Sequence, residues 1–223
     1  MDLAGIGLYT ISEAERFTSV PAREIRRWLH GYGFKVKGER HSSPPLWRTQ
    51  TGMPSAIGFR DLLELRLVSE FVSKGVHLSV IRATIAKARE WFHDDYPLTA
   101  HRFLTDGKRV FMEALEETEG ESLTDVAAQQ RVIESVIRPS LYAGVDFTPD
   151  GRARRWFPER NRAVVLDPMI GFGAPTLTSF GIRTDTIAAA LKAEKSAARV
   201  AQLFNIPRAA VTAAAAFERR HAA

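Results

Sequence analysis

The stretch YTISEAERFTSVPAREIRRWLHGYGFK (residues 9–35) contains two short amphipathic segments on either side of Ser19-Val20-Pro21. Thr10 precedes the first segment, and Glu13 follows it at the spacing of a capping box, which favours a helix over ISEAERFT. Pro21 suits the first turn of a second helix, because the missing N–H of proline costs nothing there. The stretch therefore predicts two short helices joined by a tight turn.

The second of these helices is predicted to have one apolar and one basic face. Ile25, Trp28 and Leu29 fall on one side at helical spacing, and the arginines fall largely on the other. Trp28, like Trp47 further on, is expected in the core, although stacking on bases or clamping a DNA backbone is the alternative use of such a ring. A basic, outward-facing second helix after a tight turn is typical of a helix-turn-helix.

A β-hairpin wing is expected after this pair of helices. Phe34 and Val36 alternate with lysines, residues 38–45 supply turn-forming glycine, serine and proline, and Leu46-Trp47 resume an apolar strand. Between Arg23 and Arg48 there are seven cations and two acids, a net charge of +5 that equals the net charge of the whole chain. Such a local basic patch is the electrostatic footprint of a phosphate-binding surface, although runs of charge are more often only a solvated face.

The rest of the chain predicts further helices and short hairpins. Two helices are expected at 59–74 and 78–92, a hairpin about Asp106-Gly107, a helix at 125–137, a hairpin turned at Pro149-Asp150-Gly151, a strand at 163–167 and three C-terminal helices beginning at 184, 196 and 207. The predicted fold is mainly α with small β-hairpins (α+β). We expect a winged helix-turn-helix domain at 1–93, a mixed middle region at 98–162 and a C-terminal helical domain at 163–223.

Several classes of site are disfavoured by the sequence. The chain of 223 residues has no cysteine, which excludes disulfides and thiolate metal sites. Its six histidines lack zinc-protease spacing, and GFGAP (residues 171–175) lacks the ending of a phosphate loop, so a turn is expected there. The aspartates in hairpin turns are expected for geometric reasons. We therefore predict a non-enzymatic protein without metal or cofactor, and the lack of a long apolar run or signal pattern predicts a cytoplasmic one without membrane contact.

The first 92 residues resemble the DNA-binding domain of the MerR family. The resemblance is carried by YTI, by TSVPAREIRRW with Arg23 and Arg26 three residues apart, and by FRDLLELRLVSEFVSKGVHLSVIR. It implies a winged helix-turn-helix that binds double-stranded DNA. The family's long dimerising coiled coil and its cysteine-based metal sensing are not carried over, because HDDYP (residues 93–97) ends the helix and cysteine is absent.

The C-terminal part resembles a short bacterial domain of antitoxins that are paired with PIN-like ribonuclease toxins. The matching features are Gly173 and Pro175, Gly181-Ile182, and the helices at 186–191, 200–204 and 211–218. Together the two resemblances imply a VapB-type antitoxin with a MerR-like head. Residues on one side of the last helix are expected to lie in a groove of the toxin. They are Val211, Ala214, Ala215, Phe217 and Glu218.

The predicted function is that of a DNA-binding, homodimeric antitoxin that neutralises the PIN-like toxin of a neighbouring gene and represses its own operon. The alternatives are a MerR-like regulator whose C-terminal half only dimerises or senses a small ligand, and a catalytic C-terminal half. The operator, the identity of the toxin and the dimer interface are not predicted. The residues expected to contact DNA are Thr10, Ser12, Arg23, Arg26, Arg27, Lys35, Lys37, Arg40 and Arg48.

Overall fold

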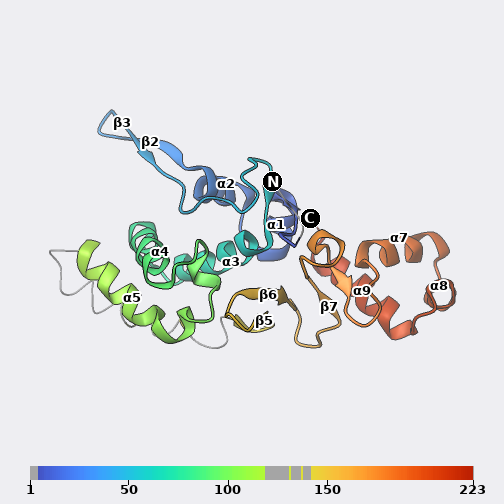
Figure 1. Ribbon diagram of the computed structural model, residues 1–223. Helices are drawn as coiled ribbons and strands as arrows, with labels where there is room; N and C mark the ends of the chain where they lie inside the picture. The colour runs from blue at the N-terminus through green and yellow to red at the C-terminus, as the bar shows by residue number, and fades with distance from the viewer. Residues whose placement is uncertain (1–4, 119–130, 132–136, 138–141, 223) are drawn as a thin grey trace.

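The computed structural model describes residues 5–118, 131, 137 and 142–222 (Figure 1). Helices dominate this part of the chain, and the strands form small antiparallel pairs, as the sequence predicts for a mainly α fold with β-hairpins. The α-helices are α1 (Ile11–Thr18), α2 (Ala22–His30), α3 (Phe59–Ser73), α4 (Leu78–Phe92), α5 (Phe103–Thr118), α7 (Thr184–Glu194), α8 (Ala197–Phe204) and α9 (Arg208–Arg220).

The described strands form two-stranded antiparallel sheets, mostly between strands that are adjacent in sequence. β1 (Tyr9–Thr10) pairs with β4 (Ala56–Ile57), β2 (Tyr32–Val36) with β3 (Glu39–Ser43), β5 (Val145–Phe147) with β6 (Ala153–Trp156), and β7 (Val164–Val165) with β8 (Thr176–Leu177). Short 3₁₀ turns occupy Pro97–Thr99 (η1) and Gly171–Gly173 (η3). The predicted helix at 125–137 lies outside the described residues except for residues 131 and 137.

The predicted hairpin about Asp106-Gly107 is wrong, because α5 runs through both residues. Phe103, Val110 and Phe111 recur at helical spacing and are buried, with Phe103 packing against Phe71 at 6.4 Å between ring centroids. Gly107 lets the Phe103 ring lie against the helix, since a Cβ there would come within 2.9 Å of Phe103 Cδ1. Tertiary packing of the apolar stripe outweighs the local turn preference of Asp-Gly.

The N-terminal elements and the C-terminal helices share one continuous apolar core. Phe17 of α1 packs against Phe217 of α9, with ring centroids 6.3 Å apart. The Tyr9 hydroxyl donates to the Gly173 carbonyl at 2.9 Å. Figure 1 shows the chain's C-terminus beside α1, although the two are far apart in sequence. The packing thus continues across the predicted boundaries near 92–98 and 158–162, and the division into three domains stays a prediction.

Candidate nucleic-acid interface

The first helix begins at the predicted cap. Thr10 Oγ1 accepts from the Glu13 amide at 3.1 Å, and the Glu13 carboxylate accepts from the Thr10 amide at 2.8 Å. This is a reciprocal capping box, and it confirms the sequence prediction. The Thr10 hydroxyl also donates to Glu13, so it is occupied within the cap, whereas Ser12 is exposed on the same turn.

The turn between α1 and α2 is held by backbone and side-chain hydrogen bonds. Ser19 adopts the left-handed conformation at φ 59°, and its amide donates to the Glu15 carbonyl at 2.8 Å. The Glu15 carboxylate accepts from the Ala22 amide at 3.0 Å, which gives the first turn of α2 a partner that Pro21 itself does not provide. The angle between the two helices is therefore fixed by groups on both sides of the turn.

Helix α2 presents two of its three arginines to solvent. Ile25, Trp28 and Leu29 are buried, which confirms the predicted apolar face and the core position of Trp28. Arg23 and Arg26 are exposed and have no ion pair with a described residue.

Arg27 is engaged within the protein. Its Nη1 donates to Glu24 at 3.0 Å, and its guanidinium lies 4.0 Å from the centroid of the Tyr32 ring. The hydrogen bond to Glu24 raises the pKa of Arg27, although the group lies near the surface. Two of the three predicted arginines are thus free to contact a ligand, and the third also positions the start of the wing.

The wing is a hairpin of β2 and β3 that extends away from the body as an arm (Figure 1). Its turn lies at Lys37 and Gly38, both at positive φ (49° and 91°), as a two-residue hairpin turn requires. The sequence predicts this hairpin with a longer turn, over residues 38–45, and with Leu46-Trp47 in the return strand. That placement is wrong: Glu39–Ser43 returns, and Leu46 and Trp47 are buried in the body.

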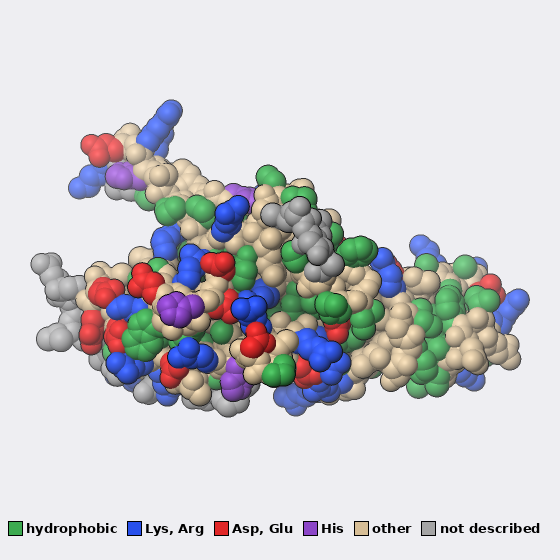
Figure 2. All heavy atoms as spheres, in the orientation of Figure 1, with side chains coloured by type: hydrophobic (Ala, Val, Ile, Leu, Met, Phe, Trp, Pro, Cys, Tyr) green, Lys and Arg blue, Asp and Glu red, His purple; other side chains and the backbone are tan. Residues whose placement is uncertain are grey.

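Cations gather at the exposed end of the wing. Lys35 lies directly opposite Arg40 in the hairpin register, and both are exposed, as is Lys37 in the turn. Like charges opposite one another destabilise a strand pair. Figure 2 shows basic side chains (blue) reaching into solvent at the tip of the arm, with acidic atoms (red) beside them. The arrangement favours an anionic ligand, which would relieve the repulsion.

The base of the wing is anchored to the body by hydrogen bonds that the sequence does not predict. The Leu46 amide donates to the Trp28 carbonyl at 2.8 Å, and Trp47 Nε1 donates to Asp61 Oδ1 at 2.8 Å. From α4, Arg82 donates to Ser43 Oγ at 2.8 Å. Burial raises the pKa of Asp61 to about 6, and its three N–H donors oppose that rise. A buried acid beside a tryptophan N–H cannot be read from sequence spacing, because the partners lie 14 residues apart in an irregular segment.

Arg48 lies off the hairpin, unlike the other predicted wing cations. Its carbonyl accepts from the Tyr96 hydroxyl at 3.0 Å, and with Arg89 and Tyr96 it lines a recess of about 420 Å³. The Arg48 side chain is exposed. The structure thus groups Arg23 and Arg26 on α2 and Lys35, Lys37 and Arg40 on the wing, and it separates Arg48 from them.

The stripe on α9 that was expected to contact a toxin is part of the core. Val211, Ala214 and Phe217 are fully buried, and Ala215 is buried as well. Glu218 accepts a hydrogen bond from Thr184 and pairs with Arg16 of α1 at 3.5 Å. The predicted position of the contact is therefore corrected: this face of α9 packs on α1 and α7, and a protein partner needs another surface.

Two properties concern the described part of the chain as a whole. Among these residues no helix is both long and apolar enough to cross a bilayer. Within the same ranges no group of three or more histidine, aspartate or glutamate side chains is arranged to hold a metal ion.

Known proteins resemble this chain over most of its length. The "Putative antitoxin VapB45" of Mycobacterium tuberculosis (strain ATCC 25618 / H37Rv) is 25% identical, over 90% of this chain and 89% of that protein. The "Uncharacterized protein Rv2308" of the same organism is 26% identical, over 81% of this chain and 77% of its own length. No family model matches. The crystal structure of Rv2018 from Mycobacterium tuberculosis covers 92% of this chain with a TM-score of 0.64 at 20% identity, so it shares the fold.

Proposed function

We propose that the protein is a DNA-binding antitoxin that neutralises a PIN-like ribonuclease toxin encoded by a neighbouring gene and represses its own operon. The observation that carries the DNA-binding half is the pair of exposed arginines on α2, which have no ion pair with a described residue, beside a wing in which Lys35 lies opposite Arg40. The antitoxin half is supported by the similarity, over nine-tenths of the chain, to a protein named as an antitoxin. Both activities belong to the cytoplasm, and neither needs a catalytic group, a cofactor or a metal.

The positions of α2 and the wing support a particular mode of DNA binding. A MerR-like head docks the second helix in the major groove, where Arg23 and Arg26 reach base edges or phosphates. Lys35, Lys37 and Arg40 hold the backbone beside it, and Ser12 adds a hydroxyl near the start of α1. One such module buries little surface, so two copies of the chain are needed on two half-sites, which makes the DNA-binding form a homodimer.

The second candidate is a MerR-like regulator whose C-terminal helices have only an internal structural role. The burial of the α9 stripe against α1 and α7 favours it, because a helix that completes the core needs no partner. The two candidates differ in what the neighbouring gene encodes and in whether its product binds this chain.

The test combines both halves of the proposal. The purified full-length chain is titrated against DNA from upstream of its own gene, and the product of the adjacent gene is assayed for RNA cleavage with and without the chain. The proposal expects a specific shift on the upstream DNA and loss of cleavage when the chain is added in equimolar amount. A specific shift without inhibition of any neighbouring gene product supports the regulator instead. If the chain neither shifts the upstream DNA nor inhibits cleavage, both candidate functions are contradicted.

A further inference from the structure

The loop that follows β7 displays large apolar side chains on the surface. Met169 is 73% exposed, Phe172 is 63% exposed and Ile170 is 41% exposed. They lie within four residues of one another, and of the three only Phe172 belongs to the turn predicted at residues 171–175. Grouped exposed apolar side chains of this size mark an interaction surface more often than isolated ones do.

This loop is held in one conformation. The Met169 amide donates to Asp167 Oδ1 at 2.9 Å, and the Leu8 amide donates to the Phe172 carbonyl at 2.9 Å. Phe172 sits at φ 56° and ψ 30°, a left-handed conformation that bulky residues rarely adopt. Strained residues of this kind persist where the surrounding structure fixes them, and they concentrate at functional sites. The backbone that carries these apolar side chains is thus held by hydrogen bonds, which lowers the entropic cost of binding a partner.

A groove of about 450 Å³ runs from this loop to the β5–β6 hairpin. It combines an apolar lining with a basic edge. The apolar lining includes Ile6, Phe59, Pro168 and Met169, and the basic edge includes Arg152 and Arg154.

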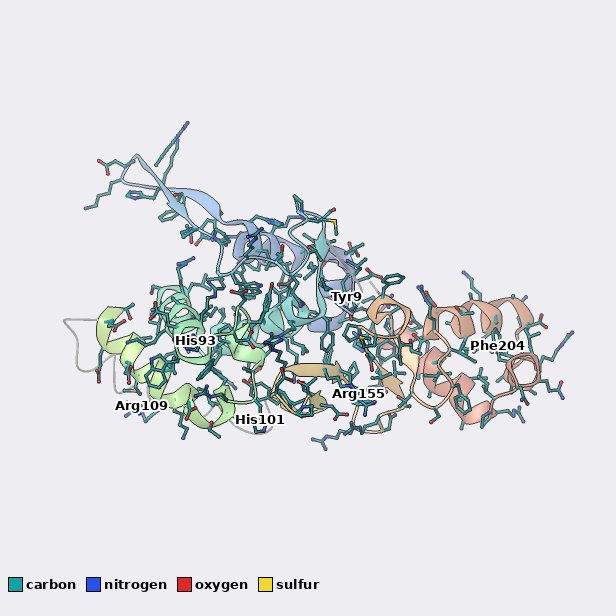
Figure 3. The ribbon with its side chains drawn as sticks, viewed as in Figure 1. Tyr9, His93, His101, Arg109, Arg155 and Phe204 are labelled. Atoms are coloured by element: carbon teal, nitrogen blue, oxygen red, sulfur yellow. The ribbon has the colours of Figure 1, made fainter. Side chains whose placement is uncertain are left out.

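The two hairpin arginines are available to a ligand. Arg154 is exposed and has no ion pair with a described residue. Arg152 pairs with Asp150 at 3.3 Å, but both side chains are more than 60% exposed, and ion pairs so exposed are weak. Arg60 also lines the groove, but it is committed to Asp94 at 2.8 Å. Figure 3 labels the next hairpin residue, Arg155, which bonds to Asp146 instead.

The composition of this face fits a protein better than a nucleic acid. Met169 lines the groove together with Arg152 and Arg154, and Ile170 and Phe172 follow Met169 in the same exposed loop. We call these five residues the apolar–arginine face. Protein interfaces are enriched in arginine, methionine and aromatic residues, whereas a phosphate backbone offers nothing to exposed apolar side chains. In Figure 1 the hairpin lies on the opposite side of α3 from α2 and the wing, so a partner on Arg152 and Arg154 leaves α2 and the wing open.

We propose that the apolar–arginine face is the surface on which the toxin binds, through a segment that carries both acidic and apolar side chains. Met169 and Phe172 are the apolar anchors, and Arg152 and Arg154 pair with the carboxylates. This inference rests on the proposed antitoxin function and replaces the buried α9 stripe as the site of contact.

The test uses the full-length chain co-expressed with the tagged product of the adjacent gene. One variant carries Arg152→Glu and Arg154→Glu, and a second carries Met169→Ser and Phe172→Asn, because asparagine tolerates the left-handed conformation. The control is Leu203→Ser, since Leu203 is 67% exposed on α8, outside the face. Each variant is also tested for its shift of upstream DNA, which reports whether the head is still folded.

We expect both double variants to bind the toxin at least about tenfold more weakly than the unaltered chain and the control, with the DNA shift unchanged. Undiminished capture by both variants overturns the assignment of the face while leaving the antitoxin function intact. Failure of the unaltered chain to capture or inhibit any neighbouring gene product overturns the antitoxin function itself, and this inference with it.

Discussion

Phe17 of α1 packs against Phe217 of α9, with ring centroids 6.3 Å apart, and the His221 ring lies 4.5 Å from the Phe217 ring. Helix α1 is therefore built partly on the last helix of the chain. Arg16 and Glu218 repeat the connection on the surface, 3.5 Å apart. A perturbation of the C-terminal helices is expected to reach the head formed by α1 and α2 through these contacts.

Phe217→Ala is expected to destabilise the head as well as the C-terminal helices. Removing a fully buried phenylalanine costs about 3–5 kcal/mol of unfolding free energy. The four tryptophans, Trp28, Trp47, Trp91 and Trp156, all precede the C-terminal helices, so their fluorescence reports the rest of the chain. We expect thermal unfolding followed by fluorescence and by far-UV circular dichroism to shift down together.

The control for this prediction is Leu203→Ala, which removes an exposed side chain and is expected to change the unfolding free energy by less than about 0.5 kcal/mol. A fluorescence transition that stays in place while the dichroism transition moves would show that the C-terminal helices unfold separately from the head.

Arg23→Ala and Arg26→Ala are each expected to weaken binding to the operator by about 1–3 kcal/mol if the side chain reads a base edge. Arg27→Ala is expected to weaken it less, because that guanidinium is engaged with Glu24 and Tyr32. Fluorescence anisotropy at one fixed salt concentration measures all three. Arg208→Ala, exposed at the start of α9, serves as the matched control. The helix-turn-helix assignment would fail if Arg23→Ala and Arg26→Ala both bound normally.

Lys35→Gln is expected to weaken binding to operator and unrelated DNA alike, and to reduce the salt dependence by about one released counterion. Because Lys35 faces Arg40 across the hairpin, the same change is expected to leave the free protein as stable or slightly more stable. The measurement is a salt titration of affinity on both DNAs, together with a denaturant melt. Lys74→Gln, exposed beyond the end of α3, is the control. Selective loss on the operator alone would contradict a backbone contact.

Glu64 is expected to make the protein less stable as the pH rises. Burial raises the pKa of this side chain to about 8, and Glu64 Oε1 accepts from the Thr99 amide at 2.9 Å while Oε2 has no partner among the described residues. The carboxyl group of Glu64 therefore binds its proton more tightly in the folded state than in the unfolded state. The contribution of Glu64 is therefore fully present below its unfolded pKa of about 4.5 and is lost as the pH rises through about 8.

Glu64→Gln keeps the acceptor for Thr99 and removes the titration. Relative to the unaltered chain, this variant is expected to gain unfolding free energy on going from pH 5 to pH 8.5, by at least about 1 kcal/mol. Glu70→Gln, exposed on the same helix, is expected to show no such gain. Denaturant melts at the two pH values measure the difference, and parallel curves for Glu64→Gln and the unaltered chain would refute the prediction.

The sequence was sufficient for structure that depends on neighbouring residues. The capping box of Thr10 and Glu13, the turn before Pro21 and the two faces of α2 follow from contacts within a few residues. The pattern at 59–92 likewise predicted the ends of α3 and α4 to within a residue, because apolar residues that recur with helical period over this length indicate an amphipathic helix. The exposed arginines of α2 follow from the same local geometry.

The tertiary structure alone decided what each apolar face contacts. Asp106-Gly107 is a turn signal by itself. Phe103 and Phe111 nevertheless pack against Phe71, and this packing stabilises residues 103–118 as helix α5. The sequence already shows that one face of α9 is apolar. Only the tertiary structure shows that Phe17 packs against Phe217 on this face. Burial depends on partners that are distant in sequence, and periodicity carries no information about those partners. For the same reason the sequence gives no sign that Met169 and Phe172 are left exposed, or that Met169 lines a groove with Arg154.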